Sequence, residues 1–348
     1  MTDVRSQFGG YVNGLSYQPL FFCGDALAIL RELPAEAIDF CMTSPPYWNQ
    51  REYASGGNGL EESHQQYLDN LLAVFAEVKR TLKPAGSFWL NIGDTYQNKS
   101  LTGIPWRLAI ALMDQQQWTL RNEVIWNKIK GPDNAHDKLR NVHEQVFHFV
   151  KSKNFYYDLD SIRSKPREAR VVNGVVISAT GVTGVRYRRQ IELSTSLTAE
   201  EKQAAFQALE EMLSDVAQGK LSDFRMVIRN QQRTTHSDSE KLSGRAKELA
   251  QKGFYFLKYH PDGSKPSDVW EILPEDTQNR VGHYAAYPED LCKIPLLATC
   301  PPDGIALDPF CGTGTTNSVA QMLQRKSVGI DLSPEYIEVA RRRCQRLI

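Results

Sequence analysis

Residues 305–331 read IALDPFCGTGTTNSVAQMLQRKSVGID, and this run joins two apolar segments through a glycine-rich turn and a helical stretch. Gly312 and Gly314 follow the first apolar segment, where a backbone without Cβ atoms turns tightly and approaches a ligand closely. Asp331 ends the second apolar segment, nineteen residues after Gly312. This order of strand, turn, helix and strand predicts part of a nucleotide-binding α/β sheet.

The turn differs from two other nucleotide-binding turns. A dinucleotide fingerprint requires a third glycine at position 317, where this chain has Asn317, and the chain has no Gly-Lys-Ser/Thr run of a P-loop. We therefore expect a ligand that contains adenosine without a pyrophosphate, with Asp331 accepting hydrogen bonds from ribose hydroxyls. The alternative is a purely structural turn in a crowded sheet.

A second motif, TSPPYW at residues 43–48, follows another apolar segment. Its prolines restrict φ and supply no N–H groups, so Ser44 Oγ and the Pro45 carbonyl oxygen are expected to form a rigid pocket of acceptors. Tyr47 and Trp48 are expected to add flat aromatic faces. Such a pocket suits a planar ring with an amino group, and the alternative is a rigid corner whose aromatic residues belong to the core.

Apolar strand-like segments alternate with helix-like segments in both outer parts of the chain. This alternation predicts βαβ units and a parallel sheet that is covered on both faces. The expected strands are residues 20–23, 38–43, 87–92, 120–126, 142–150, 305–307 and 327–330. The expected helices are residues 26–33, 67–78, 106–113, 289–299, 315–324 and 334–346.

The middle of the chain is basic. Residues 163–189 carry seven Lys/Arg and one acidic residue, and residues 224–252 carry seven Lys/Arg and three acidic residues. Between them, the spacing of Thr198 and Glu201 predicts a capping box that opens a helix. The simplest organisation is one α/β domain interrupted by a basic insertion, with parts at residues 1–160, 161–265 and 266–348.

Composition excludes several classes of protein. Lys+Arg and Asp+Glu both number 41, so contacts with nucleic acid must come from a local basic patch. The six cysteines form no CxxC pair, which predicts free buried thiols and no metal site. There is no apolar run of membrane-spanning length and no secretory signal, so we expect a cytoplasmic protein that does not contact a membrane.

Together the two motifs resemble those of the DNA amino-methyltransferases, which transfer a methyl group from S-adenosylmethionine to the exocyclic nitrogen of adenine or cytosine. That family carries a D/N/S-P-P-Y/F/W motif after a buried strand and a D-P-F-x-G-S/T-G-T-T motif for the cofactor. In this chain the catalytic motif comes first and the cofactor motif last, which is similar to the permuted β class. The resemblance implies a Rossmann-like α/β fold, circularly permuted, in which residues 161–265 form an inserted target-recognition region.

The resemblance also implies roles for individual residues. Gly24-Asp25 matches the position near the cofactor adenine, and HYAAYP at residues 283–288 resembles a segment that begins a helix beside the methionine end. The implied catalytic residues are Ser44, Pro45, Pro46 and Tyr47. The implied cofactor-binding residues are Asp25, His283, Asp308, Pro309, Phe310, Gly312, Gly314, Thr315 and Asp331.

The substrate implied by the resemblance is double-stranded DNA, whose target base must leave the helix. The Gly-rich residues 55–59 could move to let that base in, and an ordinary surface loop is the equally favoured alternative. The Ser-Pro-Pro form favours cytosine N4, with adenine N6 as the alternative, and no cysteine follows a proline as C5 methylation would require. Less favoured are an inactive DNA-binding relative and a methyltransferase for RNA or a small molecule. A homodimer and a cognate restriction endonuclease stay open as further partners.

Overall fold

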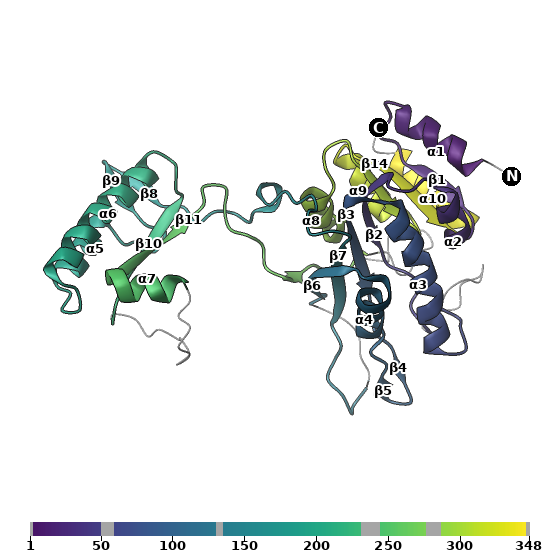
Figure 1. Ribbon diagram of the computed structural model, residues 1–348, viewed down its shortest axis with the longest axis horizontal. Coiled ribbons are helices and arrows are strands. Elements are labelled where there is room, and N and C mark those ends of the chain that lie inside the picture. The colour runs from purple at the N-terminus through teal and green to yellow at the C-terminus, as the bar shows by residue number, and fades with distance from the viewer. Residues whose placement is uncertain (1–2, 50–58, 130–134, 231–243, 276–286, 346–348) are drawn as a thin grey trace. The chain divides into compact units, whose positions relative to one another are not determined.

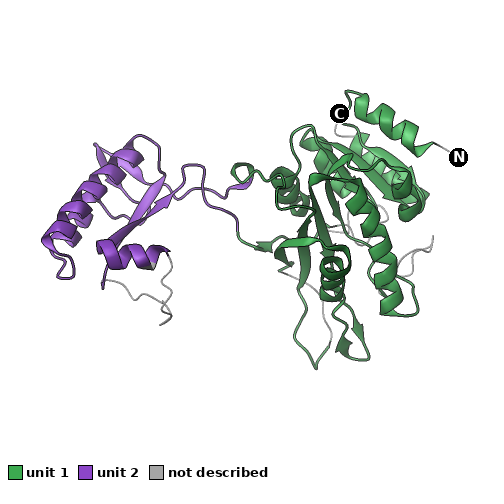
Figure 2. Ribbon diagram, viewed as in Figure 1, with its two compact units in different colours: residues 1–161, 267–348 green, residues 162–266 purple. Residues whose placement is uncertain are grey.

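The computed structural model divides the chain into two compact units (Figures 1 and 2). Unit 1 comprises Met1–Ser161 and Ser267–Ile348, and unit 2 comprises Ile162–Pro266. The assignment of unit 2 to target recognition stays a prediction. The structure describes residues 3–49, 59–129, 135–230, 244–275 and 287–345.

Unit 1 contains an eight-stranded sheet with the strand order β1-β14-β13-β2-β3-β7-β6-β12. The strands are β1 (Leu20–Cys23), β2 (Ile38–Thr43), β3 (Leu82–Ile92), β6 (Thr119–Asn127), β7 (His143–Val150), β12 (Val269–Glu271), β13 (Ile305–Asp308) and β14 (Lys326–Asp331). A separate hairpin joins β4 (Tyr96–Gln97) and β5 (Ser100–Leu101).

The expectation of an entirely parallel sheet is wrong at β7. This strand pairs antiparallel with both β3 and β6, and the other neighbouring pairs of the sheet are parallel. The described parts of the β6–β7 connection, residues 128–129 and 135–142, contain no helix. Antiparallel neighbours need no crossover helix between them, and these two pairings make the sheet mixed.

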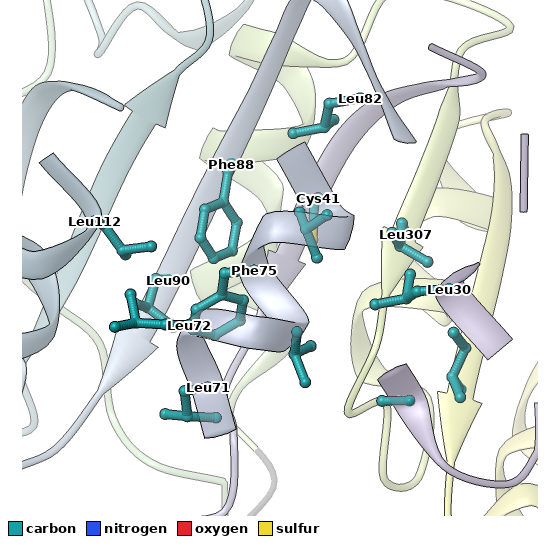
Figure 3. Close-up of a cluster of buried hydrophobic side chains, with 14 of the residues drawn as sticks. Leu30, Cys41, Leu71, Leu72, Phe75, Leu82, Phe88, Leu90, Leu112 and Leu307 are labelled. Atoms are coloured by element: carbon teal, nitrogen blue, oxygen red, sulfur yellow. The ribbon is translucent and has the colours of Figure 1, made fainter. Parts of the chain in front are cut away.

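Helices cover both faces of this sheet (Figure 1). One face carries α1 (Val4–Asn13), α2 (Ala26–Glu32), α3 (His64–Thr81) and α4 (Ile104–Gln116), and the other carries α8 (Glu289–Thr299), α9 (Thr315–Met322) and α10 (Pro334–Gln345). Figure 3 shows Leu71 and Phe75 of α3 packed near Phe88 and Leu90 of β3. Because strand side chains alternate, Trp89 instead enters the second core, with α8 and α9.

Most of the helices expected in unit 1 are present within a few residues of their predicted ends, and α8 has the expected bounds. Helix α1 was not predicted, since only Val4 and Phe8 are buried and the helix contains two glycines. Among the described residues, every helix is too short or too polar to span a lipid bilayer. All six cysteines are free, and five of them are buried.

The sheet order changes direction between β13 and β2. From β13 the chain passes through α9 to β14 on one side, and from β2 it passes through α3 to β3 on the other side. In open α/β sheets, ligands bind beyond the carboxyl ends of the strands at such a point. The glycine-rich turn follows β13 and the TSPPYW loop follows β2, so both motifs flank it.

Unit 2 has its own hydrophobic core, which includes Tyr187, Leu209 and Phe224. Its capping box is confirmed, because Thr198 Oγ1 accepts from Glu201 N at 3.2 Å and Glu201 Oε2 accepts from Thr198 N at 2.9 Å. The elements of this unit are β8 (Arg170–Val172), β9 (Val175–Ile177), α5 (Gly184–Glu192), α6 (Ala199–Ala217), β10 (Asp223–Ile228), α7 (Gly244–Lys252) and β11 (Phe254–Tyr259).

Candidate active site

The two motifs meet through a direct hydrogen bond. Leu307 of β13 lies opposite Cys41 of β2 in a parallel pair. One residue further along β13, Asp308 Oδ1 accepts from Thr43 Oγ1 at 2.6 Å, although 265 residues separate the two in sequence. The residue before Ser44 is therefore tied to the first residue of the glycine-rich turn.

Asp308 is a buried link between four segments. Besides Thr43, its carboxylate accepts from Tyr287 Oη at 3.0 Å, Thr316 Oγ1 at 2.8 Å and Phe310 N at 3.2 Å. Burial raises the pKa of Asp308 from 3.8 to about 6, although these hydrogen bonds act in the opposite direction. The carboxylate thus holds the TSPPYW loop, the glycine-rich turn, α9 and the segment before α8 together, and a contact between Asp308 and the cofactor stays a prediction.

This buried carboxyl group should make stability depend on pH. The pKa of Asp308 is about 6 in the folded state and 3.8 in the unfolded chain, so the protonated carboxyl group stabilises the fold fully only below pH 3.8. This contribution is lost as the pH rises through 6. The stability advantage of wild type over Asp308→Asn should therefore be greater at about pH 4.5 than at about pH 7.5, by on the order of 2 kcal/mol. Urea unfolding at both values tests this, and an equal difference at the two would contradict it.

The glycine-rich turn needs its glycines. Gly312 has φ 50° and Gly314 has φ 75°, in the left-handed region that other residues rarely adopt. A Cβ on Gly314 would lie 2.9 Å from the Cβ of Ala340, so a side chain there would also push α10 away. Gly312 N donates to Asp331 Oδ2 at 2.9 Å, which closes the turn against the end of β14.

The carboxyl end of β1 completes this side of the site. Gly24 N donates to the Asp331 carbonyl oxygen at 2.9 Å, which brings Asp25 beside β14, and Asp25 caps α2 by accepting from Ala28 N at 2.8 Å. Asp331 also accepts from Ser333 N at 2.8 Å, and burial raises its pKa.

The residues around the turn fit an adenosine-containing cofactor. Two carboxylates, those of Asp25 and Asp331, are acceptors for hydroxyl groups, and the half-buried ring of Phe310 supplies an apolar surface. Pro309 is buried, and Thr315 Oγ1 accepts from Arg343 Nη1 at 2.9 Å. His283 lies outside the described residues, as do most of the predicted mobile residues 55–59.

The TSPPYW loop is held by hydrogen bonds from within and from α3. Ser44 Oγ donates to Tyr47 Oη at 3.2 Å, and Tyr67 Oη of α3 donates to the Pro46 carbonyl oxygen at 2.9 Å. The expectation that Trp48 offers a face to the pocket is wrong. Its side chain belongs to the hydrophobic core at 3% exposure, and its Nε1 donates to the Glu61 carbonyl oxygen. Tyr47 is half-buried and stays the candidate aromatic face.

Four residues beside Tyr47 were not predicted from the sequence. Glu144 of β7 accepts from Tyr47 Oη at 2.7 Å and from Asn91 Nδ2 of β3 at 2.9 Å, and Lys128 pairs with its other oxygen. Gly93 leaves room for the Tyr47 ring, because a Cβ there would lie 2.7 Å from Tyr47 Cε2. No local sequence pattern joins these positions, since they meet only through strand pairing. Among the described residues, no group of three or more His, Cys, Asp or Glu side chains is arranged to hold a metal ion.

The fold and these two loops define an α/β domain with a candidate ligand site beyond the carboxyl ends of β13 and β2. A family model described as DNA methylase, for the N6/N4 class, matches residues 38–342. The chain therefore belongs to this family of DNA amino-methyltransferases.

Several curated relatives are similar over most of their length. Type II methyltransferase M.SfiI of Streptomyces fimbriatus is 29% identical, with 91% of this chain and 88% of the relative covered. M.SmaI of Serratia marcescens is 28% identical, with 93% and 89% covered. DNA adenine methyltransferase YhdJ of Escherichia coli is 25% identical, with 92% and 80% covered.

Two solved structures share the fold. The cytosine-N4-specific PvuII DNA methyltransferase has a TM-score of 0.58 at 17% identity, with 94% of this chain and 86% of that chain covered. The protein TTHA0409 of Thermus thermophilus, complexed with S-adenosyl-L-methionine, has a TM-score of 0.51 at 18% identity, with 94% and 93% covered. These likenesses show the α/β fold with a central mixed sheet.

Proposed function

We propose that this chain is a site-specific DNA methyltransferase of the permuted β class that methylates the exocyclic amino group of a flipped base in duplex DNA. S-adenosyl-L-methionine is the cofactor, and when bound it supplies the methyl group. The observation that carries the proposal is the 2.6 Å bond between Thr43 and Asp308, which joins the SPPY loop to the cofactor turn. Both loops follow adjacent parallel strands at the point where ligands bind in such sheets.

The residues of the catalytic loop would activate the target nitrogen. An exocyclic amine is a poor nucleophile because its lone pair is delocalised into the ring. Ser44 Oγ and the Pro45 carbonyl oxygen would accept its N–H groups, which favours a pyramidal nitrogen with an available lone pair. Tyr47 would stack on the base, and Pro46 would hold the loop, with its carbonyl oxygen fixed by Tyr67. Orientation within the site then supplies much of the rate.

We propose cytosine N4 as the methylated position, because the motif has the Ser-Pro-Pro form. Adenine N6 is the second candidate, which the similarity to a relative named as an adenine methyltransferase supports. Expression in a methylation-free host, followed by single-molecule sequencing of its DNA, identifies both the base and the recognition site. N4-methylcytosine at one sequence is expected. A methylated adenine supports the second candidate, and unmodified DNA from cells that contain the folded protein supports an inactive DNA-binding relative.

We further propose that unit 2 recognises the DNA site. Arg186 and Arg189 are exposed on α5, and within the described residues neither forms an ion pair, so both charges are available to phosphates. The relatives named as type II methyltransferases support a cognate restriction endonuclease as a further partner. A homodimer stays a prediction.

Neutralising the two free arginines should weaken DNA binding. Each phosphate contact contributes about −0.9 to the slope of log K against log salt, so Arg186→Gln/Arg189→Gln should flatten that slope by roughly 2 units. Arg188→Gln on the same helix is the matched control, because Arg188 is already paired with Glu210 at 2.5 Å and should contribute less. Fluorescence anisotropy with duplex DNA over a salt series measures both. Equal slopes for wild type and the double variant would count against a phosphate-binding α5.

A further inference from the structure

A line of hydrogen bonds leads from the catalytic motif into the sheet. Ser44 Oγ–H donates to Tyr47 Oη at 3.2 Å, and Tyr47 Oη–H donates to Glu144 Oε2 at 2.7 Å. Both donors are oriented in the same direction, and the line ends at a carboxylate, which accepts protons. Burial raises the pKa of the Tyr47 hydroxyl well above its ordinary value, so this group carries a proton along the line without becoming a base itself.

The end of the line is a partly buried charge that needs compensation. The Glu144 side chain is 12% exposed and the Lys128 side chain 27% exposed, and these two residues form an ion pair. Asn91 Nδ2 adds a hydrogen bond to the oxygen that Tyr47 also contacts. Replacing such a buried pair by apolar residues is often neutral or stabilising, so stability alone gives little reason for a carboxylate here.

Two further observations indicate a built site. A Cβ on Gly93 would lie 2.7 Å from Tyr47 Cε2 and 3.3 Å from Glu144 Oε1, so a side chain would disturb their contact. Leu90 of β3 pairs with Thr43 of β2. Asn91, the next residue of β3, therefore lies at the level of Ser44, which follows β2. Its buried Oδ1 has no hydrogen-bond partner among the described residues, which is unusual outside functional sites.

We propose that Ser44, Tyr47 and Glu144 form a proton path for the methyl-transfer reaction, an inference that rests on the proposed function. As the target nitrogen gains the methyl group, its N–H proton passes to Ser44 Oγ. The Ser44 proton passes to Tyr47 Oη, and the Tyr47 proton passes to Glu144 Oε2. Both hydroxyls end neutral, the base loses the positive charge it gained with the methyl group, and the Glu144 carboxyl group releases the proton to solvent between turnovers.

The first test is Glu144→Gln, which keeps an acceptor for Tyr47 Oη but provides no carboxylate. Removal of a general base typically lowers a rate by 10²–10⁴-fold, so we expect single-turnover methyl transfer to slow by roughly 10²-fold while the affinities for DNA and cofactor stay within about 2-fold. The variant rate should also rise with pH over roughly pH 6.5 to 9, because hydroxide then takes the proton.

Asp39→Asn is the matched control. Asp39 forms an ion pair with Lys83, and its side chain is also 12% exposed. It lies near the amino end of β2, away from the TSPPYW loop at the carboxyl end of that strand. A purely structural role for Glu144 would give both variants a lower melting temperature and an unchanged pH profile. Glu144→Gln with the wild-type rate at every pH, or with a loss of rate that only follows unfolding, would overturn the path.

Tyr47→Phe keeps the proposal testable if Glu144→Gln does not fold. This variant keeps the ring that stacks on the base and removes the middle of the path, so DNA affinity should be retained and the rate should fall about as far as in Glu144→Gln. The double variant should lose little more than either single variant, because both interrupt one path. Full additivity, or a Tyr47→Phe rate equal to wild type, would overturn the inference. DNA methylation by wild type checks the proposed function separately.

Discussion

The Ser44→Ala enzyme is expected to transfer methyl groups roughly 10²-fold more slowly than wild type in a single turnover, because removing one preorganised hydrogen-bond partner of a transition state typically costs 10²–10³-fold. Ser44 Oγ is the acceptor expected to face the target amine, and it also donates to Tyr47. Its bond matters most as the nitrogen becomes pyramidal, so the affinities for DNA and cofactor should change little.

Thermal melting measured beside the rate separates catalysis from stability. The matched control is Ser63→Ala, since Ser63 Oγ caps α3 by accepting from Gln66 N at 3.2 Å. Losing that cap typically costs about 1 kcal/mol, which should lower the melting temperature and leave the methyl-transfer rate of the folded enzyme unchanged. A Ser44→Ala protein that methylates at the full rate would remove this residue from the mechanism.

Asp331→Ala should weaken cofactor binding by roughly 10- to 150-fold, because a hydrogen bond to a charged group contributes about 1.5–3 kcal/mol. The carboxylate ends β14 and is the acceptor expected to contact ribose hydroxyls. Its bond from Gly312 N also closes the glycine-rich turn, so the substitution removes both contributions.

Isothermal titration calorimetry with S-adenosyl-L-methionine measures this loss directly. Asp69→Ala is the control, because Asp69 is an exposed carboxylate on α3 that accepts from Gln65 within the same helix. It should bind the cofactor as wild type does. If Asp331→Ala binds the cofactor as tightly as wild type, the ribose contact has been assigned to the wrong residue.

The sequence predicted most of the strands and helices of unit 1, because continuous apolar runs and helical spacing are local signals. It also predicted the two loops, because glycines with positive φ and paired prolines constrain the backbone wherever they occur. The Thr198 capping box was also predicted, because it depends only on two residues three positions apart.

What the sequence did not reveal depends on which strands become neighbours. The β6–β7 connection carries no two-residue turn signal, so the antiparallel direction of β7 was not predicted, although the strand itself was. Trp48 follows Tyr47 directly, and only the fold sends one ring into the core and the other toward Glu144. Glu144, Lys128 and Asn91 come from three separate segments, and their meeting follows from a register that local patterns do not encode.

The most direct measurement combines the purified chain, methyl-labelled S-adenosyl-L-methionine and unmethylated duplex DNA, followed by mass spectrometry of the released nucleosides. We expect the label on an exocyclic amino nitrogen, as N4-methylcytosine, and at a rate that Ser44→Ala strongly reduces. Label at C5 of cytosine, or no label in DNA from a protein that binds both the cofactor and the duplex, would contradict the assignment of the two loops to one amino-methylating site.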